Sequence, residues 1–265
     1  MINDTTFDTL VANPIRFSKA NSKLEKLAKV EALKQFTRGK KSSIYSFDML
    51  AGHSCPFALD CRSKAIELDN GKRKVVDGAF TKFRCYAASQ EARLTNVYKK
   101  REANFNSMKA LATQKGIGAH EMADVICDHL PFAGLIRIHS SGDFFNYRYF
   151  RAWVIVAFRN PRIRFYAYTK AVRFWLKYES EVGNLPRNLS LVASKGGTDD
   201  HLISSTMPEA IVVYSKEEAD TLGLEIDNDD SHAAIGGTKF ALLIHGTQPK
   251  GSEAQRALVA LKGVK

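Results

Sequence analysis

Five short runs of β-forming residues, each followed directly by polar side chains, constrain the fold of this chain more than any other feature. The runs cover residues 135–139, 164–168, 189–193, 210–214 and 240–244, and a helical segment over 147–158 separates the first two. Strands that alternate with helices are typical of βαβ units around a mostly parallel sheet. We therefore expect an α/β fold, either a partial (β/α) barrel or a mostly parallel sheet. In both, ligands bind beyond the carboxyl ends of the strands, so the polar residues predict one shared site.

The part of the chain that precedes these runs is predicted to be helical and to carry most of the cysteines. Helical spacing of apolar residues covers 15–41, 87–115 and 120–129, with a strand-like piece at 43–50 and a loop rich in Gly, Cys, Pro and Asp after it. We assign residues 1–134 to a basic helical and metal-loop region. Residues 135–265 form the β/α region, and we expect one continuous domain.

The charge of the chain suits a nucleic-acid partner, and its hydropathy argues against a membrane partner. The chain has 39 Lys and Arg against 28 Asp and Glu, a net charge of +11, with the surplus in residues 1–186. A basic surface suits a nucleic acid because each cation that meets a phosphate releases counterions, although a solvated surface has the same composition. No apolar run reaches the roughly 18 residues of a membrane span, and residues 1–13 lack a signal-peptide pattern. We expect a cytoplasmic protein without a membrane partner.

Three cysteines are candidate metal ligands. Cys55 and Cys61 flank a loop, and Cys85 follows further along the chain. Without an export signal these thiols should stay reduced or bind metal. Several soft sulfur ligands suit zinc or an iron–sulfur cluster, with a fourth position open to His53, Cys127 or an exogenous ligand. The alternative is that the thiols are unrelated core and surface residues.

The first run ends in a histidine, two hydroxyls and a carboxylate. His139 and Asp143 belong to this cluster, and Asp143 could serve as a base, a nucleophile or a metal ligand. Asp143 could equally be the N-cap of the helix that starts near Phe144, where Asp is favoured.

Polar residues after the next two runs are candidate substrate ligands. These residues are Thr169, Lys170, Arg173, Ser194, Lys195, Gly196 and Gly197. Glycine amides beside a lysine suit a phosphate or a carboxylate. Arg173 lies in a segment, 148–178, that interleaves basic and aromatic residues, a composition that can hold single-stranded nucleic acid or a flipped base.

Two further groups carry imidazoles. Residues 227–232 contain three carboxylates, including Asp230, followed by His232, and such a set suits a hard cation or proton transfer. An exposed acidic turn would have the same sequence. His245 directly follows the last run. A lone histidine is more often structural, but its place at a strand end makes a functional role an equal alternative.

Several strings in the sequence resemble those of a known family. They lie at 18–24 (SKANSKL), 52–56 (GHSCP), 84–87 (RCYA), 137–144 (RIHSSGDF), 165–170 (FYAYTK) and 245–249 (HGTQP). Together they resemble the phage "gene product 88" family over nearly the whole chain. A fainter likeness is to phage proteins of the radical-SAM type. It implies a partial (β/α) barrel, similar to a TIM barrel, with an iron–sulfur cluster at the top edge of the sheet held by Cys55, Cys61 and Cys85.

We therefore expect a metal-dependent, phage-type enzyme that modifies a nucleic acid or its bases. DNA modification is one such activity, and the sequence leaves DNA and RNA both open. Its cofactor would be an iron–sulfur cluster, with S-adenosylmethionine, or zinc. Protons and substrate would be handled by a set of five residues: Asp143, His139, Asp230, His232 and His245. One alternative is base exchange at a glycosidic bond, with Asp143 as nucleophile and a structural zinc. Another is a non-catalytic, zinc-stapled protein that binds DNA or RNA, and a third is a protein that disarms a host factor by contact.

Overall fold

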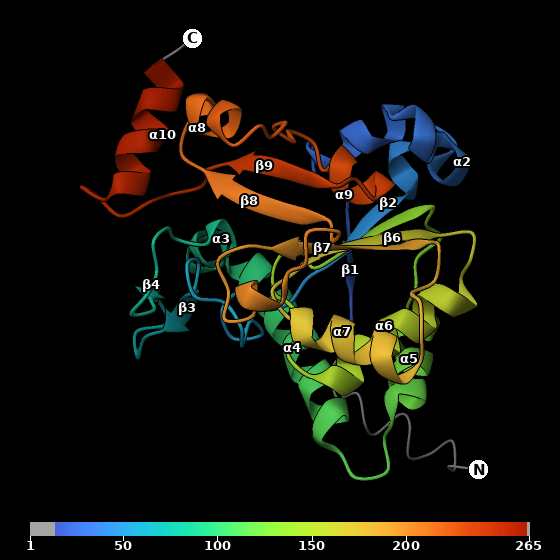
Figure 1. The fold of residues 1–265 in the computed structure, drawn as a ribbon. Coiled ribbons are helices and arrows are strands. Elements are labelled where there is room, and N and C mark those ends of the chain that lie inside the picture. Colours follow the sequence, from blue (N-terminus) through green and yellow to red (C-terminus); the bar gives the residue numbers. More distant parts are fainter. Residues whose placement is uncertain (1–13, 264–265) are drawn as a thin grey trace.

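A seven-stranded sheet organises the computed structural model, which describes residues 14–263 (Figure 1). Residues 1–13, to which the expectation about a signal peptide refers, and residues 264–265 lie outside the described residues. In spatial order the strands are β1 (Phe17–Lys19), β2 (Ile44–Phe47), β5 (Leu135–Ile138), β6 (Arg164–Thr169), β7 (Leu189–Ser194), β8 (Glu209–Val213) and β9 (Lys239–Leu243). All neighbouring pairs are parallel except β1 with β2.

This topology confirms the expected fold class. The six parallel strands follow one another in chain order and the sheet does not close, which fits both a mostly parallel sheet and a partial (β/α) barrel. The five runs seen in the sequence correspond to β5 to β9 within one or two residues at each end. Because the parallel strands share one direction, their carboxyl ends all lie along one edge.

Four helices cover one face of the sheet (Figure 1). They are α4 (Thr95–Thr113), α5 (Ala119–Asp128), α6 (Tyr147–Arg159) and α7 (Val172–Glu181). The strands alternate, as a pleated sheet requires, so that Ile136 and Ile138 pack against these helices while Leu135 packs into the opposite cluster. Both faces are therefore buried, which explains why the strands are nearly continuous apolar runs.

The opposite face carries shorter elements. These are the 3₁₀ helices η1 (Leu24–Lys29), η2 (Glu31–Leu33) and η3 (Lys41–Ser43), and the short helices α2 (Lys34–Thr37) and α9 (Ser231–Ile235). The prediction of one helix over 15–41 was therefore wrong. Leu24, Leu27 and Leu33 recur at multiples of three residues, the period of a 3₁₀ helix, and all three are buried against the sheet.

The segment between β2 and α4 departs most from expectation. A separate hairpin, β3 (Ser63–Glu67) with β4 (Arg73–Asp77), was not predicted. The helix expected over 87–115 is two helices, α3 (Tyr86–Arg93) and α4, because Leu94 adopts an extended conformation between them. The remaining elements are η4 (Asp200–Leu202), α8 (Lys216–Thr221) and α10 (Glu253–Gly263).

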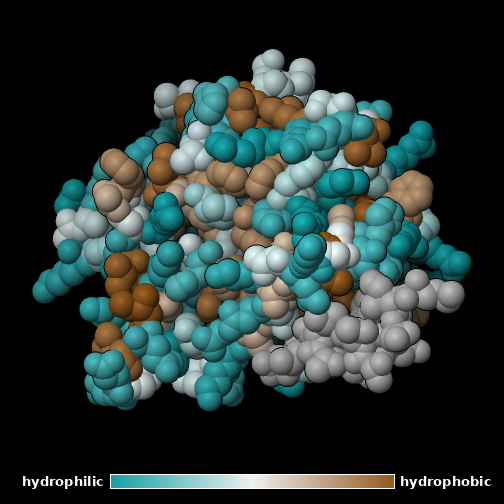
Figure 2. All heavy atoms as spheres, turned by 90° about the horizontal axis from the view of Figure 1, so that it is seen from below, coloured by the Kyte–Doolittle hydropathy of each residue, from teal (hydrophilic) through white to brown (hydrophobic). Residues whose placement is uncertain are grey.

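The outer surface of the helical layer is mixed in character. Figure 2 shows hydrophobic groups scattered between hydrophilic ones on the face seen from below. Within residues 14–263, no helix combines the length and the hydropathy that a membrane crossing requires.

Candidate functional site

The loop that carries Cys55 and Cys61 lies across the carboxyl ends of the strands. The amides of Leu59 and Asp60 donate to the carbonyl of Gly196 at 3.1 and 3.0 Å. The amide of Thr198 donates to the carbonyl of Phe57 at 2.9 Å. The cysteine loop is thereby fixed to the loop that follows β7.

Cys85 reaches the same place from the start of α3. The amides of Lys82 and Phe83 donate to the carbonyl of Asp60 at 2.8 and 3.0 Å, and the amide of Cys85 donates to Ser63 Oγ at 3.3 Å. Two segments distant in sequence therefore bring three thiols to one edge of the sheet.

Electrostatics show that the three thiols are neighbours. Burial raises the pKa of Cys55 well above its ordinary value, and the negative charges of Asp143, Cys85 and Cys61 raise it further. Burial, then Cys61, raises the pKa of Cys85 to about 12. All four cysteines are free thiols. Cys127 belongs to a different place, since it lies in α5 and accepts a hydrogen bond from Asn160 Nδ2 at 3.6 Å.

The arrangement differs from a mononuclear zinc site. Among residues 14–263, no group of three or more His, Cys, Asp or Glu side chains is placed to hold a metal ion. A zinc site would need such a group within about 2.0–2.3 Å of one centre. His53, a candidate fourth ligand, is engaged elsewhere, because its Nε2 lies 3.2 Å from the carbonyl of Ala65.

Asp143 is buried and fully hydrogen-bonded. It accepts from Thr169 Oγ1 at 2.7 Å, from the amide of Lys170 at 2.8 Å and from the amide of Phe144 at 2.7 Å. Burial, opposed by these bonds, raises its pKa to about 6. Asp143 is not the cap of α6, because the side chain of Asn146 accepts from the Tyr149 amide in that role. With both oxygens occupied, Asp143 holds neighbouring loops together and is poorly placed to attack a sugar.

The lysine and glycine loop after β7 binds its own chain. Lys170 Nζ donates to the carbonyl of Ser194 at 2.9 Å and to that of Lys195 at 2.5 Å. The amides of Gly196 and Gly197, the candidate phosphate ligands, both donate to the carboxylate of Asp200 at 2.9 Å. These amides therefore already bind an anion, the side chain of Asp200. Lys195 itself makes an ion pair with Glu209 at 3.5 Å.

His139 faces the helical layer. Its Nε2 lies 2.9 Å from the hydroxyl of Tyr149, and its ring packs edge-on against Phe144. Burial, then the charge of Arg137, lowers its pKa to about 3, so the imidazole is neutral at neutral pH. His139 has a positive φ of 67° at the end of β5.

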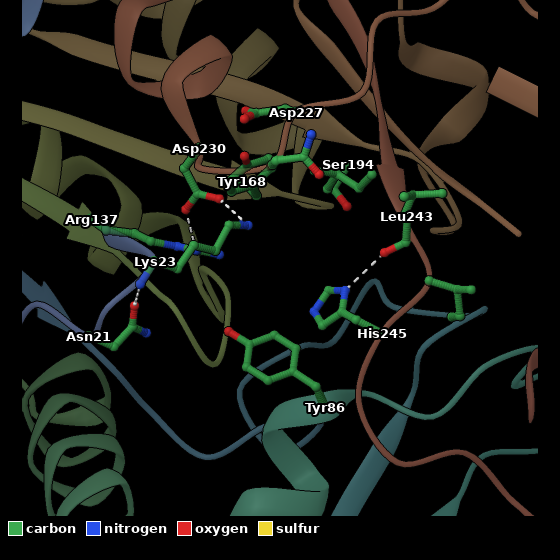
Figure 3. Close-up of a pocket in the computed structure, with 13 residues that line it drawn as sticks. Asn21, Lys23, Tyr86, Arg137, Tyr168, Ser194, Asp227, Asp230, Leu243 and His245 are labelled. Carbon is green, nitrogen blue, oxygen red and sulfur yellow. Dashed lines mark hydrogen bonds and ion pairs between the residues drawn. The ribbon is translucent and has the colours of Figure 1, made fainter. Parts of the chain in front are cut away.

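A cavity of about 500 Å³ opens on the face of the sheet opposite the helical layer. Of the predicted site residues it is lined by Asp230, His245 and Ser194. Figure 3 shows Tyr86 projecting from the start of α3 toward the centre, with His245 on one side and Lys23 on the other. Tyr86 directly follows Cys85 in the chain, but no cysteine of the described residues lines the cavity itself.

A buried ion-pair network forms one wall of this cavity (Figure 3). Asp230 is 1% exposed and pairs with Lys23 Nζ at 2.7 Å and with the guanidinium of Arg137. Tyr166 donates its hydroxyl to the same carboxylate at 3.1 Å. Burial acts against the charge, but Arg137 and Lys23 outweigh it and lower the pKa of Asp230. Lys23 and Arg137 thus carry one positive charge more than Asp230 neutralises, and Asp227, a second acid that lines the cavity, lies near Lys23.

The acidic stretch 227–232 is not an exposed turn. Asp227 is buried and lines the cavity, and burial raises its pKa. His232 lies in α9, with Nε2 at 3.1 Å from Glu225 and Nδ1 at 3.8 Å from Asp227. His245 lines the cavity with its side chain open to solvent, and desolvation by the surrounding walls lowers its pKa. Its Nδ1 lies 3.1 Å from the carbonyl of Leu243.

The basic and aromatic segment 148–178 places several of its rings in the core. Phe165 and Tyr166 are fully buried, and Trp175 is 7% exposed. Arg173 makes a bidentate pair with Asp199, at 2.6 and 2.9 Å, and its guanidinium lies over Phe57. These three buried rings belong to the core and cannot stack on a base, whereas Tyr168, Phe174 and Tyr178 of the same segment are half-buried.

A comparison with known protein families identifies the family of this chain. The family model "Gene product 88" matches residues 16–262, a span that includes the sheet, the thiols and the cavity. The chain belongs to this family. No curated protein and no solved structure matches it.

The charged and aromatic cavity residues of this gene product 88 protein that were not singled out in the sequence include Lys23, Tyr86 and Arg137. Arg137 had a usable signal, since a charged residue inside an apolar strand run must face a polar space or a partner. Tyr168 stacks under it, 5.0 Å from the guanidinium carbon. Lys23 and Tyr86 carried no such signal, because each lies far from the strands in sequence.

Proposed function

We propose that this gene product 88 protein is an iron–sulfur-dependent enzyme that modifies a base of a nucleic acid in the cytoplasm of the host cell. The observation that carries the proposal is the approach of two segments, which bear three free, part-buried thiols, to the carboxyl edge of the parallel strands. Tyr86, the residue after Cys85, lines a polar cavity. In (β/α) barrels the reacting groups come from the loops at that edge.

The donor set suits a cluster better than a single ion. Cys85 and Cys61 raise the pKa of Cys55, and Cys61 raises that of Cys85, yet no described group is placed to hold one metal ion. Thiolates of a cluster bind different iron atoms, so they stand further apart than ligands that share one ion. Thiolate ligands are typical of iron–sulfur clusters.

A cluster held by three protein thiolates would leave one iron open to S-adenosylmethionine and would supply the electron for its reductive cleavage. The chain's own residues would bind and orient the substrate. A cavity of about 500 Å³ lies within the usual range of small-ligand sites, roughly 300–1,000 Å³. It is large enough for one nucleotide.

The walls of the cavity match the parts of a nucleotide. Lys23 and Arg137 offer positive charge for a phosphate, and Tyr86 offers an aromatic face for a base. The net charge of +11 favours a polyanionic substrate. His245, whose imidazole is neutral at neutral pH because burial lowers its pKa, is the side chain suited to accept a proton there.

Metal analysis of protein purified without oxygen tests this proposal. We expect iron and acid-labile sulfide in the intact chain and a brown colour that S-adenosylmethionine perturbs. Cys55→Ser, Cys61→Ser and Cys85→Ser should each lose the iron. Cys127→Ser is the matched control, because Cys127 lies apart in α5, and it should keep the iron.

Three results would contradict the proposal. Zinc without sulfide would support a structural metal in a non-catalytic nucleic-acid-binding protein. Absence of any metal would contradict both the iron–sulfur enzyme and the zinc-containing nucleic-acid-binding protein. Loss of iron in Cys127→Ser to the same degree as in the other three variants would show that the effect is one of folding.

A further inference from the structure

A second cavity adjoins the first on the other side of Tyr86. It has a volume of about 410 Å³ and lies between the β1–β2 edge and the helices α3 and α4. Tyr86 and Asn21 line both cavities. Two side chains therefore separate one space from the other.

The shared wall is held in place. The hydroxyl of Tyr86 donates to the carbonyl of Ser140, directly after β5, and the ring centroid lies 5.0 Å from that of His245. Asn21 Oδ1 accepts from the amides of Lys23 and Leu24 at 3.0 Å. An aromatic ring fixed between two polar spaces is suited to stack a base, which is how single strands are held without sequence readout.

The second cavity keeps free positive charge. Arg101 is neutralised by Glu91, at 3.0 Å. Lys19 and Lys100 also line this cavity, and within residues 14–263 no carboxylate lies within ion-pair distance of either ammonium. Lys100 Nζ donates instead to Ser18 Oγ.

The one acid of this cavity is largely satisfied. Asp48 accepts from the amide of Ser140 at 2.8 Å and from Ser46 Oγ at 2.9 Å. Two unpaired ammonium groups against one hydrogen-bonded carboxylate leave this space net positive. An anionic group is the ligand that such a space favours.

We infer that the two cavities are adjoining subsites for one single-stranded polynucleotide, the first for the nucleotide that is modified and the second for the phosphate of its neighbour. This inference rests on the proposed function for the chemical class of the ligand. It adds that the substrate is a residue within a chain and not a free nucleotide. A phosphate in the second subsite would contribute a further salt-sensitive contact.

Binding measured against ligand length tests the inference. The probes are thymidine 5′-monophosphate and single-stranded oligodeoxythymidylates of two, four and eight nucleotides, with matching oligouridylates to separate DNA from RNA. We expect the affinity to rise about tenfold, a change of roughly 1.4 kcal/mol, once the probe spans both subsites.

Variants that remove the lysines of the second cavity test whether the higher affinity for longer probes arises there. The double variant Lys19→Ala/Lys100→Ala should lose about tenfold in affinity for the longer probes and leave the mononucleotide unaffected. Lys99→Ala is the matched control, since Lys99 is exposed on the same helix and lines neither cavity. Lys23→Ala, in the first cavity, should weaken binding of every probe alike.

Several outcomes overturn the inference. They are an affinity independent of length, an equal loss in Lys99→Ala and the double variant, and failure of every probe to bind. Iron and sulfide are measured in the same samples, so the two proposals fail separately. If binding depends on probe length but the protein contains no iron, the cluster proposal is rejected and the two-subsite inference stands. If the protein contains iron and sulfide but binds none of the probes, the subsites and the nucleic-acid substrate are rejected and the cluster proposal stands.

Discussion

Asp143 accepts a hydrogen bond from the main-chain amide of Lys170 at 2.8 Å, and this bond joins the end of β5 to the end of β6. The ammonium of Lys170 continues the connection to the carbonyl of Ser194, at the end of β7. The loop after Ser194 holds the cysteine loop through Gly196. The positions of the thiols therefore depend on Asp143 through a chain of hydrogen bonds, without any direct chemistry by its carboxylate.

Asp143→Asn should lower the free energy of unfolding by about 1–3 kcal/mol, because an amide nitrogen would face a buried donor. Thr169→Val removes only the bond from Thr169 Oγ1 and should cost about 1 kcal/mol. Urea unfolding at neutral pH measures both. An unchanged stability of Asp143→Asn together with lost activity would show that the carboxylate acts on the substrate.

Asp230→Asn should be far more damaging than Lys23→Ala. Asp230 is the countercharge of Arg137, whose side chain is 14% exposed, and a buried charge left without its partner costs about 3–5 kcal/mol. Lys23 is 40% exposed, so its loss should cost under about 1 kcal/mol. Asn tolerates the positive φ of 68° at this position, so the substitution changes charge and little else. Equal losses of stability would contradict this assignment.

His139 should make the protein labile to acid. Its pKa in the folded state, about 3, lies below the ordinary value of 6.5, so the folded state binds fewer protons than the unfolded state. The stability from neutral His139 is present above pH 6.5 and is lost as the pH falls from 6.5 toward 3, at up to about 1.4 kcal/mol per unit. His139→Asn suits the positive φ and should flatten the curve of unfolding free energy against pH. Parallel curves for the two proteins would exclude this role.

Gly196→Ala should disturb the thiols more than Gly183→Ala. Both glycines have positive φ, 97° and 115°, so both substitutions carry a similar backbone strain of about 1–3 kcal/mol. An added Cβ at Gly196 would lie 2.9 Å from Asp60 Cβ, next to Cys61, whereas nothing lies within 4 Å at Gly183. We expect a larger loss of both stability and bound iron in Gly196→Ala. Equal iron content in the two variants would show that the cysteine loop adapts.

The sequence predicted the sheet well because its signal is local. Each run from β5 to β9 is a short apolar segment bounded by polar residues, and strands of that kind are recognised without knowing their neighbours. The edge at which Asp143, Lys170 and Ser194 meet followed from strand direction alone. The 3₁₀ helices were misread because Leu24 and Leu27 fit a helical period as well as a period of three.

The roles of individual residues were harder to predict because they depend on partners distant in sequence. Nothing near Asp230 indicates that Arg137 lies beside it, 93 positions away. Gly196 and Gly197 looked like a phosphate loop, and only the fold shows Asp200 bound to their amides. A local pattern specifies which groups are available, and tertiary contacts decide which of them are already engaged.

The acidic wall of the cavity is anchored to the last strand of the sheet. The amide of Asp227 donates to the carbonyl of Ala241 at 2.9 Å, and the amide of Ala241 donates to the carbonyl of Glu225 at 2.8 Å. These bonds extend the sheet by a short parallel bridge beyond β9. A ligand that enters there meets groups already in position, so little of its binding free energy is lost to ordering the protein. Selectivity at such a preorganised wall would come from shape and charge, with little room for adaptation to a poorly fitting molecule.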